Sequence, residues 1–394
     1  MTTGFNIVVP SLISDEILVE FPVSTETTEE VLKGLMVGFT FLGAFFGVLL
    51  CSFLADYFGR KMVTFVGSGM CLLMCITIVF SDNIYLYSVL RLFGGVGIGF
   101  LGTVCPLYIR ETSPFEKRAG FAVIFKGFLN LGIVLAYVCG YLLEIQNWRI
   151  LMGFGGFTPF ILLFISYFGM TETSIHIYTK RNYSPLPLIK KFFYLKQLKK
   201  TIALTLLIVL QYFTGLEGVI YFGDTVYNFY DNGPIIQIGL GVWNMVTCFP
   251  IIYFSHRLPL FKSTIIFTSL MAISLSLISI FANDGLYPNF LFKAVGVTSS
   301  TMVYIVLHTL LSSTFWLLYV ELFGAEETGF YFVNAISLIF QMISTTFFLL
   351  LFSSMDMYKT YLTFAIITII AAIGLKIFLP FPPSQRSQSH STIN

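Results

Sequence analysis

Two charged residues lie inside long apolar runs, where a charge is costly. Lys126 lies within the apolar stretch at 119–143, and Glu217 lies within another at 202–227. In the middle of a membrane, an isolated Lys or Glu side chain costs about 2.5–3.5 kcal/mol or more. Each of these side chains therefore requires a partner or water, and both are candidates for binding a polar or charged ligand.

Amide and aromatic side chains surround Glu217. Gln211 and Tyr212 precede the acid, and Tyr221 follows it. An amide offers both donors and an acceptor, and an aromatic ring can cover the C–H face of a polyol. The segment is therefore suited to binding a polyol, and Gly215 would let the helix bend or unwind there.

A second group of charged residues gathers at the ends of apolar runs. Asp56 and Arg60 lie between two such runs, and Gly59 can adopt the positive φ that a tight turn between helices requires. Glu111 and Arg118 lie seven residues apart, directly after a third apolar run. Acids and bases in these positions can bond to the ends of neighbouring helices.

The composition is that of a polytopic membrane protein. Hydrophobic residues make up 56% of the chain, charged residues 11%, and the mean hydropathy is +0.85. No basic stripe, phosphate loop, zinc motif or nucleophile motif occurs in the sequence, so we expect no nucleic-acid binding, enzymatic catalysis, cofactor or metal. The 6 cysteines lie in apolar runs without metal-ligand spacing, and we interpret them as packing residues.

The apolar runs predict an all-α fold with six helices on each side of one polar loop. The expected helices lie at 1–21 (partial), 35–54, 62–80, 87–107, 119–143, 150–170, 202–227, 235–254, 265–281, 290–320, 329–352 and 358–379. The expected units are an N-terminal bundle at 1–170, a central cytoplasmic loop at 171–200, a C-terminal bundle at 201–380 and a cytoplasmic tail at 381–394.

The distribution of basic residues predicts the orientation. If the helices alternate in direction, most Lys and Arg residues fall on the side of the central loop. By the positive-inside rule that side is cytoplasmic, which places both termini inside. The opposite side then holds only Lys33, Arg91, Arg149, Lys293 and Lys359.

The first segment, at 1–21, is too short for a spanning helix and has no cationic region typical of a signal peptide. We interpret it as part of a first helix whose preceding half is missing. A start codon assigned too late would produce this pattern, and so would a protein that has lost half of its first helix.

Several of these segments resemble motifs of the sugar porter family of the major facilitator superfamily. The resemblance implies two six-helix bundles with a substrate held between them near mid-membrane. The bundles would open this site to one side of the membrane and then to the other. The matching segments are Pro106-x-Tyr108-x-x-Glu111-x-x-Pro114-x-x-x-Arg118, Asp56-Tyr57-Phe58-Gly59-Arg60, and Gln211 to Tyr221.

The resemblance also implies a substrate site. Lys126 stands where the family usually has a sugar-contacting glutamine, and Glu217 stands in place of an asparagine. The two could form an ion pair across the substrate path, or each could pair with a charged substrate or a coupled proton. In an alternative register, Asn130 takes the glutamine's place and Lys126 snorkels to the interface. The implied substrate contacts are Lys126, Gln211, Tyr212, Glu217, Tyr221, Asn244 and Trp316.

A second implied set is a conformational network of ion pairs between the cytoplasmic ends of the two halves, which would favour the outward-open state. Glu111 follows the fourth expected helix and Glu321 the tenth, as two related halves would require. Ser312 and Phe315 stand near Trp316 where the family has Gly and Pro, so we expect a weaker break in that helix. The network comprises Asp56, Gly59, Arg60, Glu111, Arg118 and Glu321.

We therefore expect an integral protein of the lipid bilayer, in the plasma membrane, that carries a hexose or related sugar. Asn6, in place of an aspartate in the first helix, favours facilitated diffusion over proton symport. His308 is either a proton site or a hydrogen-bonded packing residue. Two alternatives remain open: a sugar sensor that does not transport, and a facilitator of a charged small solute that uses Lys126 and Glu217.

Overall fold

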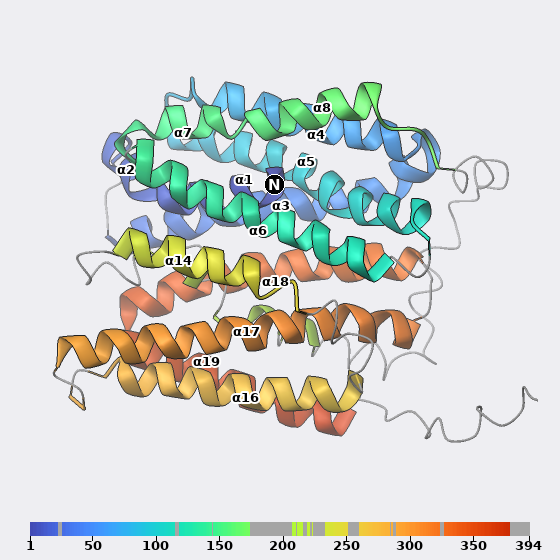
Figure 1. The fold of residues 1–394 in the computed structure, drawn as a ribbon. Helices are drawn as coiled ribbons and strands as arrows, with labels where there is room; N and C mark the ends of the chain where they lie inside the picture. The colour runs from blue at the N-terminus through green and yellow to red at the C-terminus, as the bar shows by residue number, and fades with distance from the viewer. Residues whose placement is uncertain are drawn as a thin grey trace, which may run out of the picture.

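The structure is a bundle of helices whose long axes share roughly one direction (Figure 1). It is a computed structural model, and it describes residues 1–22, 26–114, 118–143, 145–173, 207–209, 211–215, 219–220, 223, 233–250, 260–283, 285–286, 289–323 and 327–378. The side chains of several residues within these ranges, among them 118, 316 and 321, are not described.

Within the described residues, nine candidate spans are long and apolar enough to cross a membrane. Each coincides with one of the runs expected from the sequence, because a backbone in lipid must satisfy its own hydrogen bonds and does so as a helix. They are α3 (Glu26–Phe58), α4 (Arg60–Ile78), α5 (Ile84–Thr112), α6 (Arg118–Leu143), the run η2 (Ile145–Asn147), α7 (Trp148–Phe154) and α8 (Phe157–Phe168), then α16 (Leu260–Phe281), α17 (Phe290–Phe323), α18 (Glu327–Ser354) and α19 (Met357–Phe378).

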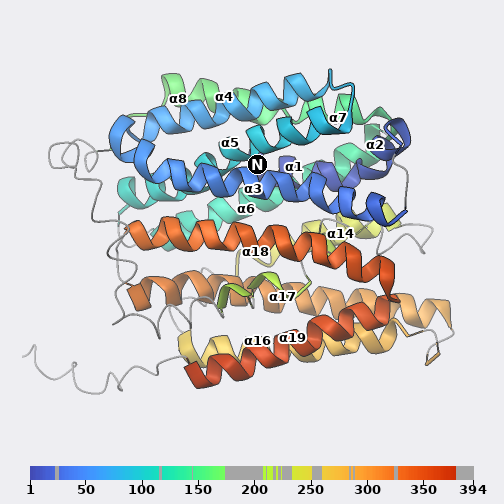
Figure 2. The same ribbon diagram turned by 180° about the vertical axis from the view of Figure 1, so that it is seen from behind.

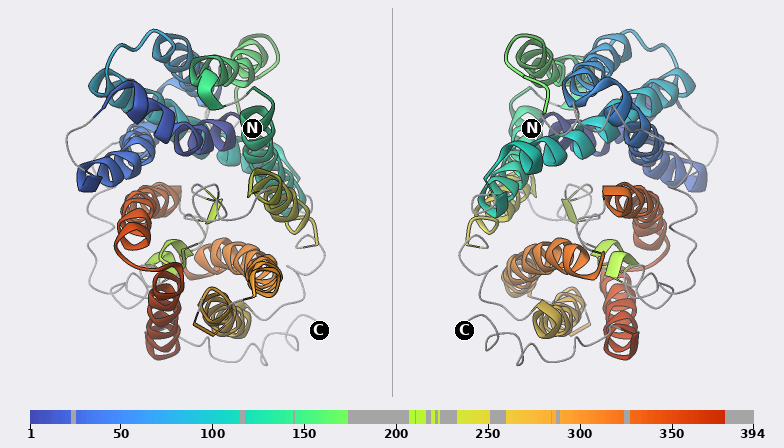
Figure 3. Two further views of the ribbon diagram at one scale, coloured as in Figure 1. Left: turned by 90° about the vertical axis from the view of Figure 1, so that its left-hand side faces the viewer. Right: turned by 90° about the vertical axis from the view of Figure 1, so that its right-hand side faces the viewer.

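The two halves of the chain form two groups of helices. The elements from α3 to α8 lie on one side and α16 to α19 on the other, as the views from front and back agree (Figures 1 and 2). The end-on views show the same division, with α14 (Gly233–Val246) where the groups meet (Figure 3). The groups join mainly along two seams, α3 with α18 and α6 with α14.

The first segment of the chain is a packed part of the first group. It forms α1 (Thr2–Leu12) and α2 (Ser14–Glu20), and the apolar face of α1 is buried, as shown by Phe5 and Val9. α1 lies so close to α6 that a Cβ placed at Gly132 would overlap the backbone carbonyl of Met1. The segment thus fills the place of an inner helix in the first group.

Small residues allow α5 to lie directly against α3. A Cβ at Gly95 would overlap the backbone carbonyl of Thr40, and one at Gly99 would overlap that of Ala44. This close approach is what a small-xxx-small pattern predicts. A Cβ at Gly102, in contrast, would meet no atom of another described helix within 4 Å, so Gly102 is not part of the contact.

Candidate functional site

One face of α6 carries the polar side chains that reach toward the second group. Lys126, Asn130 and Tyr137 are separated by four and then seven residues, which brings all three to the same side of a helix. Lys126 and Asn130 donate hydrogen bonds to α17 and α14, and the Tyr137 hydroxyl donates to the backbone carbonyl of Ile220. This face therefore lines the contact between the two halves.

Lys126 contacts the second half of the chain directly. Its Nζ donates to the Ser312 hydroxyl on α17 at 2.9 Å, and Gln211 Nε2 donates to the same hydroxyl at 3.2 Å. Lys126 is half-buried, whereas Ser312 and Gln211 are buried, with 5% and 7% of their surface exposed. The alternative in which Lys126 snorkels to the interface is therefore wrong, because the ammonium points across the bundle.

The segment 211–215 is helical at Gln211 and Tyr212 and leaves helical geometry from Phe213 to Gly215. Gly215 has φ of 80°, which favours glycine, and the backbone carbonyls around it are held by side chains of α17. Tyr304 donates from its hydroxyl to the Thr214 carbonyl at 2.8 Å, and His308 Nε2 lies 3.2 Å from the Gln211 carbonyl. This contact requires the proton on Nε2, so His308 is a hydrogen-bonded residue here.

Asn244 lies where α6, α14 and α17 meet. Asn130 Nδ2 donates to the Asn244 backbone carbonyl at 3.2 Å, and Thr309 donates from its hydroxyl to Asn244 Oδ1 at 3.4 Å. Asn244 is buried, with 7% exposed. The structure thus brings Lys126, Gln211 and Asn244, three of the expected substrate contacts, to the same inner contact between the halves.

Arg91, expected on the side of the membrane opposite the central loop, lies inside the first group of helices. The side chain is fully buried on α5 and donates from Nη2 to the backbone carbonyl of Asn6, while its Nε has no hydrogen-bond partner among the described residues. The Asn6 side chain donates to the Thr2 carbonyl at 3.0 Å and accepts from Cys75 Sγ at 3.2 Å. Within the described residues, the hydrogen-bond acceptor of this buried guanidinium on α1 is therefore a backbone carbonyl and not a carboxylate.

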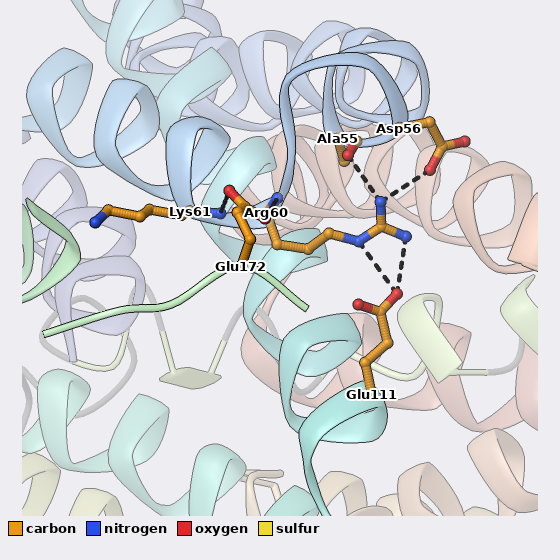
Figure 4. Close-up of polar contacts among 6 residues, drawn as sticks. All are labelled: Ala55, Asp56, Arg60, Lys61, Glu111 and Glu172. Atoms are coloured by element: carbon orange, nitrogen blue, oxygen red, sulfur yellow. Dashed lines mark hydrogen bonds and ion pairs between the residues drawn. The ribbon is translucent and has the colours of Figure 1, made fainter. Parts of the chain in front are cut away.

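The turn between α3 and α4 holds a compact ion-pair cluster, drawn in Figure 4. Arg60 donates from Nε and Nη2 to Glu111 Oε1 at 3.1 and 2.8 Å, and from Nη1 to Asp56 Oδ1 at 3.1 Å. Its Nη1 also donates to the Ala55 carbonyl at 2.8 Å. All four residues belong to the first half of the chain, so these pairs tie α3, α4 and α5 to each other.

Glu172, four residues beyond the end of α8, completes the same cluster. Its two carboxylate oxygens accept from the backbone N–H groups of Arg60 and Lys61, each at 3.0 Å (Figure 4). These are orphan donors at the start of α4, where a negative charge is also favoured by the helix dipole. Gly59, with φ of 97°, makes the turn, and a Cβ there would meet the Glu172 carboxylate.

A third polar cluster lies at the opposite end of the first group. Glu20, at the end of α2, accepts from Trp148 Nε1 at 2.8 Å and forms an ion pair with Arg149 at 2.6 Å. Arg149 also donates to the backbone carbonyls of Val79 and Ser81. Hydrogen bonds from Arg149 hold the pKa of Glu20 below its ordinary value.

Part of the expected site lies outside the described residues. Glu217 and Tyr221 lie outside the described residues, and the side chains of Trp316, Arg118 and Glu321 do as well. Tyr212 is described and half-buried, and its backbone carbonyl accepts from Ser344. The proposed pairing of Lys126 with Glu217, and ion pairs between the halves through Glu321, therefore stay predictions.

Sequence reasoning missed Ser312 as a partner of Lys126 and Glu172 as the cap of α4. A signal for Ser312 was available: it follows His308 by four residues, so both lie on one face of α17. α17 runs from Phe290 to Phe323 as one helix. This agrees with the weaker helix break that we expect where Ser312 and Phe315 replace Gly and Pro. No sequence rule would have assigned Glu172 to α4, because that contact joins residues over a hundred positions apart.

Comparison with known proteins identifies similar chains over nearly the whole length. The family model described as "Sugar (and other) transporter" matches residues 2–185 and 169–381. A curated relative, the glucose transporter GlcP of Staphylococcus epidermidis, is 23% identical over 391 residues, which covers 88% of this chain and 85% of that protein.

Solved structures share the fold. The partially occluded, inward-open conformation of the xylose transporter XylE from E. coli superimposes with a TM-score of 0.80 at 16% identity, covering 96% of this chain and 95% of that one. XylE bound to 6-bromo-6-deoxy-D-glucose, a major facilitator superfamily protein, gives a TM-score of 0.77 at 17% identity, covering 96% and 93%. The chain thus has the major facilitator fold.

Proposed function

Because this chain belongs to the sugar (and other) transporter family, we propose that it carries a hexose or related sugar across a membrane by alternating access. The observation that carries the proposal is the contact of Lys126 with Ser312, between the two halves and within the membrane-spanning part. Polar side chains are costly at this depth, and they are typical of a solute path between two bundles.

The substrate contacts that we propose supply amides, aromatic rings and a charge of each sign. Gln211 and Asn244 are supported by their buried positions beside Lys126 and Thr309, where their amides can exchange present partners for sugar hydroxyls. The set is Lys126, Gln211, Tyr212, Glu217, Tyr221, Asn244 and Trp316.

We further propose that the two moving bodies are residues 1–170 and 201–380, joined by a central loop at 171–200 and followed by a tail at 381–394. The Arg60 cluster would then lie on the cytoplasmic side of the plasma membrane, with both termini. A set of residues would hold the helix ends on that side and set the balance between the outward-open and inward-open states. They are Asp56, Gly59, Arg60, Glu111, Arg118 and Glu321.

Transport by facilitated diffusion is supported by Asn6. Its backbone carbonyl accepts from the buried Arg91 and its side-chain amide accepts from Cys75, so among the described residues no carboxylate takes up and releases a proton at this contact. The proposed carrier should therefore equilibrate its sugar without using a proton gradient.

Uptake of a panel of radiolabelled hexoses and pentoses into proteoliposomes tests the proposal. We expect equilibrative uptake of at least one sugar, recovered unchanged, since a carrier makes and breaks no covalent bond. Gln211→Leu should lower the rate at least tenfold, because the leucine cannot replace the amide's hydrogen bonds. Gln146→Leu, at an exposed position, is the matched control. No uptake of any sugar in the panel would contradict the carrier.

A sensor that binds sugar without transporting it is a second candidate. It is favoured by α17, which continues unbroken past Ser312, and by the hydrogen bonds that join α6 to the second half. Such bonds must break for the halves to rock. Saturable sugar binding by the purified protein, combined with no flux in proteoliposomes, would select the sensor.

A further inference from the structure

The Lys126 ammonium lies between the two groups of helices without a negatively charged partner among the described residues. It lies on α6 within the candidate span Val123–Leu143, and its one hydrogen bond within the described residues goes to the neutral hydroxyl of Ser312 at 2.9 Å. Among the described side chains, no Asp or Glu forms an ion pair with it. An ammonium can donate three hydrogen bonds, so this one retains capacity for an anion.

A buried polar atom without a hydrogen-bond partner among the described residues lies on another side chain that contacts Ser312. Gln211 donates from Nε2 to the same Ser312 hydroxyl, whereas its Oε1 is buried and has no hydrogen-bond partner in the part of the chain that the structure describes. A buried amide oxygen without a donor is unusual in a folded protein and indicates a missing partner. Around Ser312 the protein therefore offers a cation and, on the neighbouring side chain, an acceptor for one hydroxyl group.

We propose that the solute this site prefers is an anionic sugar: a monosaccharide carboxylate of the aldonate or uronate class. Its carboxylate accepts from Lys126, and an adjacent hydroxyl donates to Gln211 Oε1. The inference rests on the proposed carrier function and names the substrate class for that site. A neutral hexose would satisfy Gln211 but leave the half-buried ammonium without a counter-charge among the described residues.

The number of charges favours a carboxylate over a phosphate. Lys126 supplies one positive charge, which a carboxylate balances, whereas a sugar phosphate carries about 1.5 to 2 negative charges near neutral pH. His308 is engaged by the backbone, with Nε2 lying 3.2 Å from the Gln211 carbonyl, and we assign it no contact with the anion. Among the described residues at this contact Lys126 is the charged side chain, and balancing its one charge with one charge selects a sugar acid.

Equilibrium binding of labelled gluconate, glucuronate, glucose and glucose 6-phosphate to the purified full-length protein tests this, together with flux in proteoliposomes. We expect gluconate or glucuronate to bind at least tenfold more tightly than glucose. Lys126→Gln should weaken binding of the acids at least tenfold and lower the ratio of acid affinity to glucose affinity by a similar factor. Lys126→Arg, which keeps the charge, should retain the preference for acids. Lys376→Gln, at an exposed position on α19, is the matched control.

The other outcomes separate the two proposals. Glucose flux without binding of either acid would overturn the preference and leave the sugar carrier standing. Tighter binding of glucose 6-phosphate, or acid binding that is equal in wild type and Lys126→Gln, would also overturn it. Absence of binding and flux for all four compounds would contradict the inference and count against the carrier as well.

Discussion

Arg60 donates two hydrogen bonds to one oxygen of Glu111, from Nε at 3.1 Å and from Nη2 at 2.8 Å, and both side chains are 1% exposed. The pair joins the start of α4 to the end of α5. Removing one partner from a buried ion pair leaves an uncompensated charge, which typically costs about 3–5 kcal/mol. This contact is therefore a strong determinant of how the helix ends of the first half are held.

Glu111→Gln should loosen this cluster. The amide keeps an acceptor for Arg60 but loses the charge, so we expect a lower melting temperature in detergent and a shift of the carrier toward the inward-open state. Single cysteines introduced at each mouth, labelled with a membrane-impermeant maleimide, report the shift. Unchanged labelling at both mouths would show that the pair does not bias the conformation.

Glu172→Ala should destabilise the protein by about 0.5–2 kcal/mol, the usual cost of losing a helix cap, because two backbone N–H groups at the start of α4 lose their acceptor. Thermal unfolding of the purified protein measures the change. Thr171→Ala is the matched control, since the side chain of Thr171 is exposed and only its backbone carbonyl accepts, from Tyr108. Equal melting temperatures for the two variants would contradict the capping role.

The ion pair of Glu20 with Arg149 should give a small dependence of stability on acid pH. Arg149 lowers the pKa of Glu20, so the folded state binds this proton less readily than the unfolded state. The stabilisation is complete above about pH 4.3, the ordinary glutamate pKa, and is lost as the pH falls through the lowered value. Both side chains are more than a third exposed, so solvent screening limits the effect to about 1 kcal/mol or less.

Comparing the acid unfolding of wild type with that of Glu20→Gln isolates this contribution. The variant lacks the titrating carboxylate, so the difference in stability between the two proteins should shrink as the pH falls below the ordinary glutamate range. A difference that stays constant down to the lowest pH would show that the charge of Glu20 does not contribute to stability, since the glutamine keeps an acceptor for Trp148.

Asn6→Asp should make transport sensitive to a proton gradient. The substitution places a titratable carboxylate beside the buried guanidinium of Arg91, where Asn6 Oδ1 now accepts from Cys75 Sγ at 3.2 Å. We expect uptake by the variant to rise at least twofold with an inward proton gradient, whereas wild-type uptake should not respond. The control is Asn147→Asp, at an exposed position. A wild-type response of the same size would contradict facilitated diffusion.

The sequence alone was enough to predict the spanning segments and their order. Lengths of apolar chain such as 35–54 and 358–379 match α3 and α19, because lipid permits only a helix over such a run. The close approach of Gly95 and Gly99 to α3 fits their spacing in the sequence, since glycines four residues apart on an apolar helix leave room for another backbone.

Only the tertiary structure decided which side chains meet. Lys126 and Ser312 are separated by 186 positions, and their contact depends on how α6 and α17 are rotated and crossed, which hydropathy does not encode. The burial of Arg91 and the capping of α4 by Glu172 have the same origin. Apolar length determines that a helix crosses the membrane, whereas the packing of two faces determines where its few polar groups find partners.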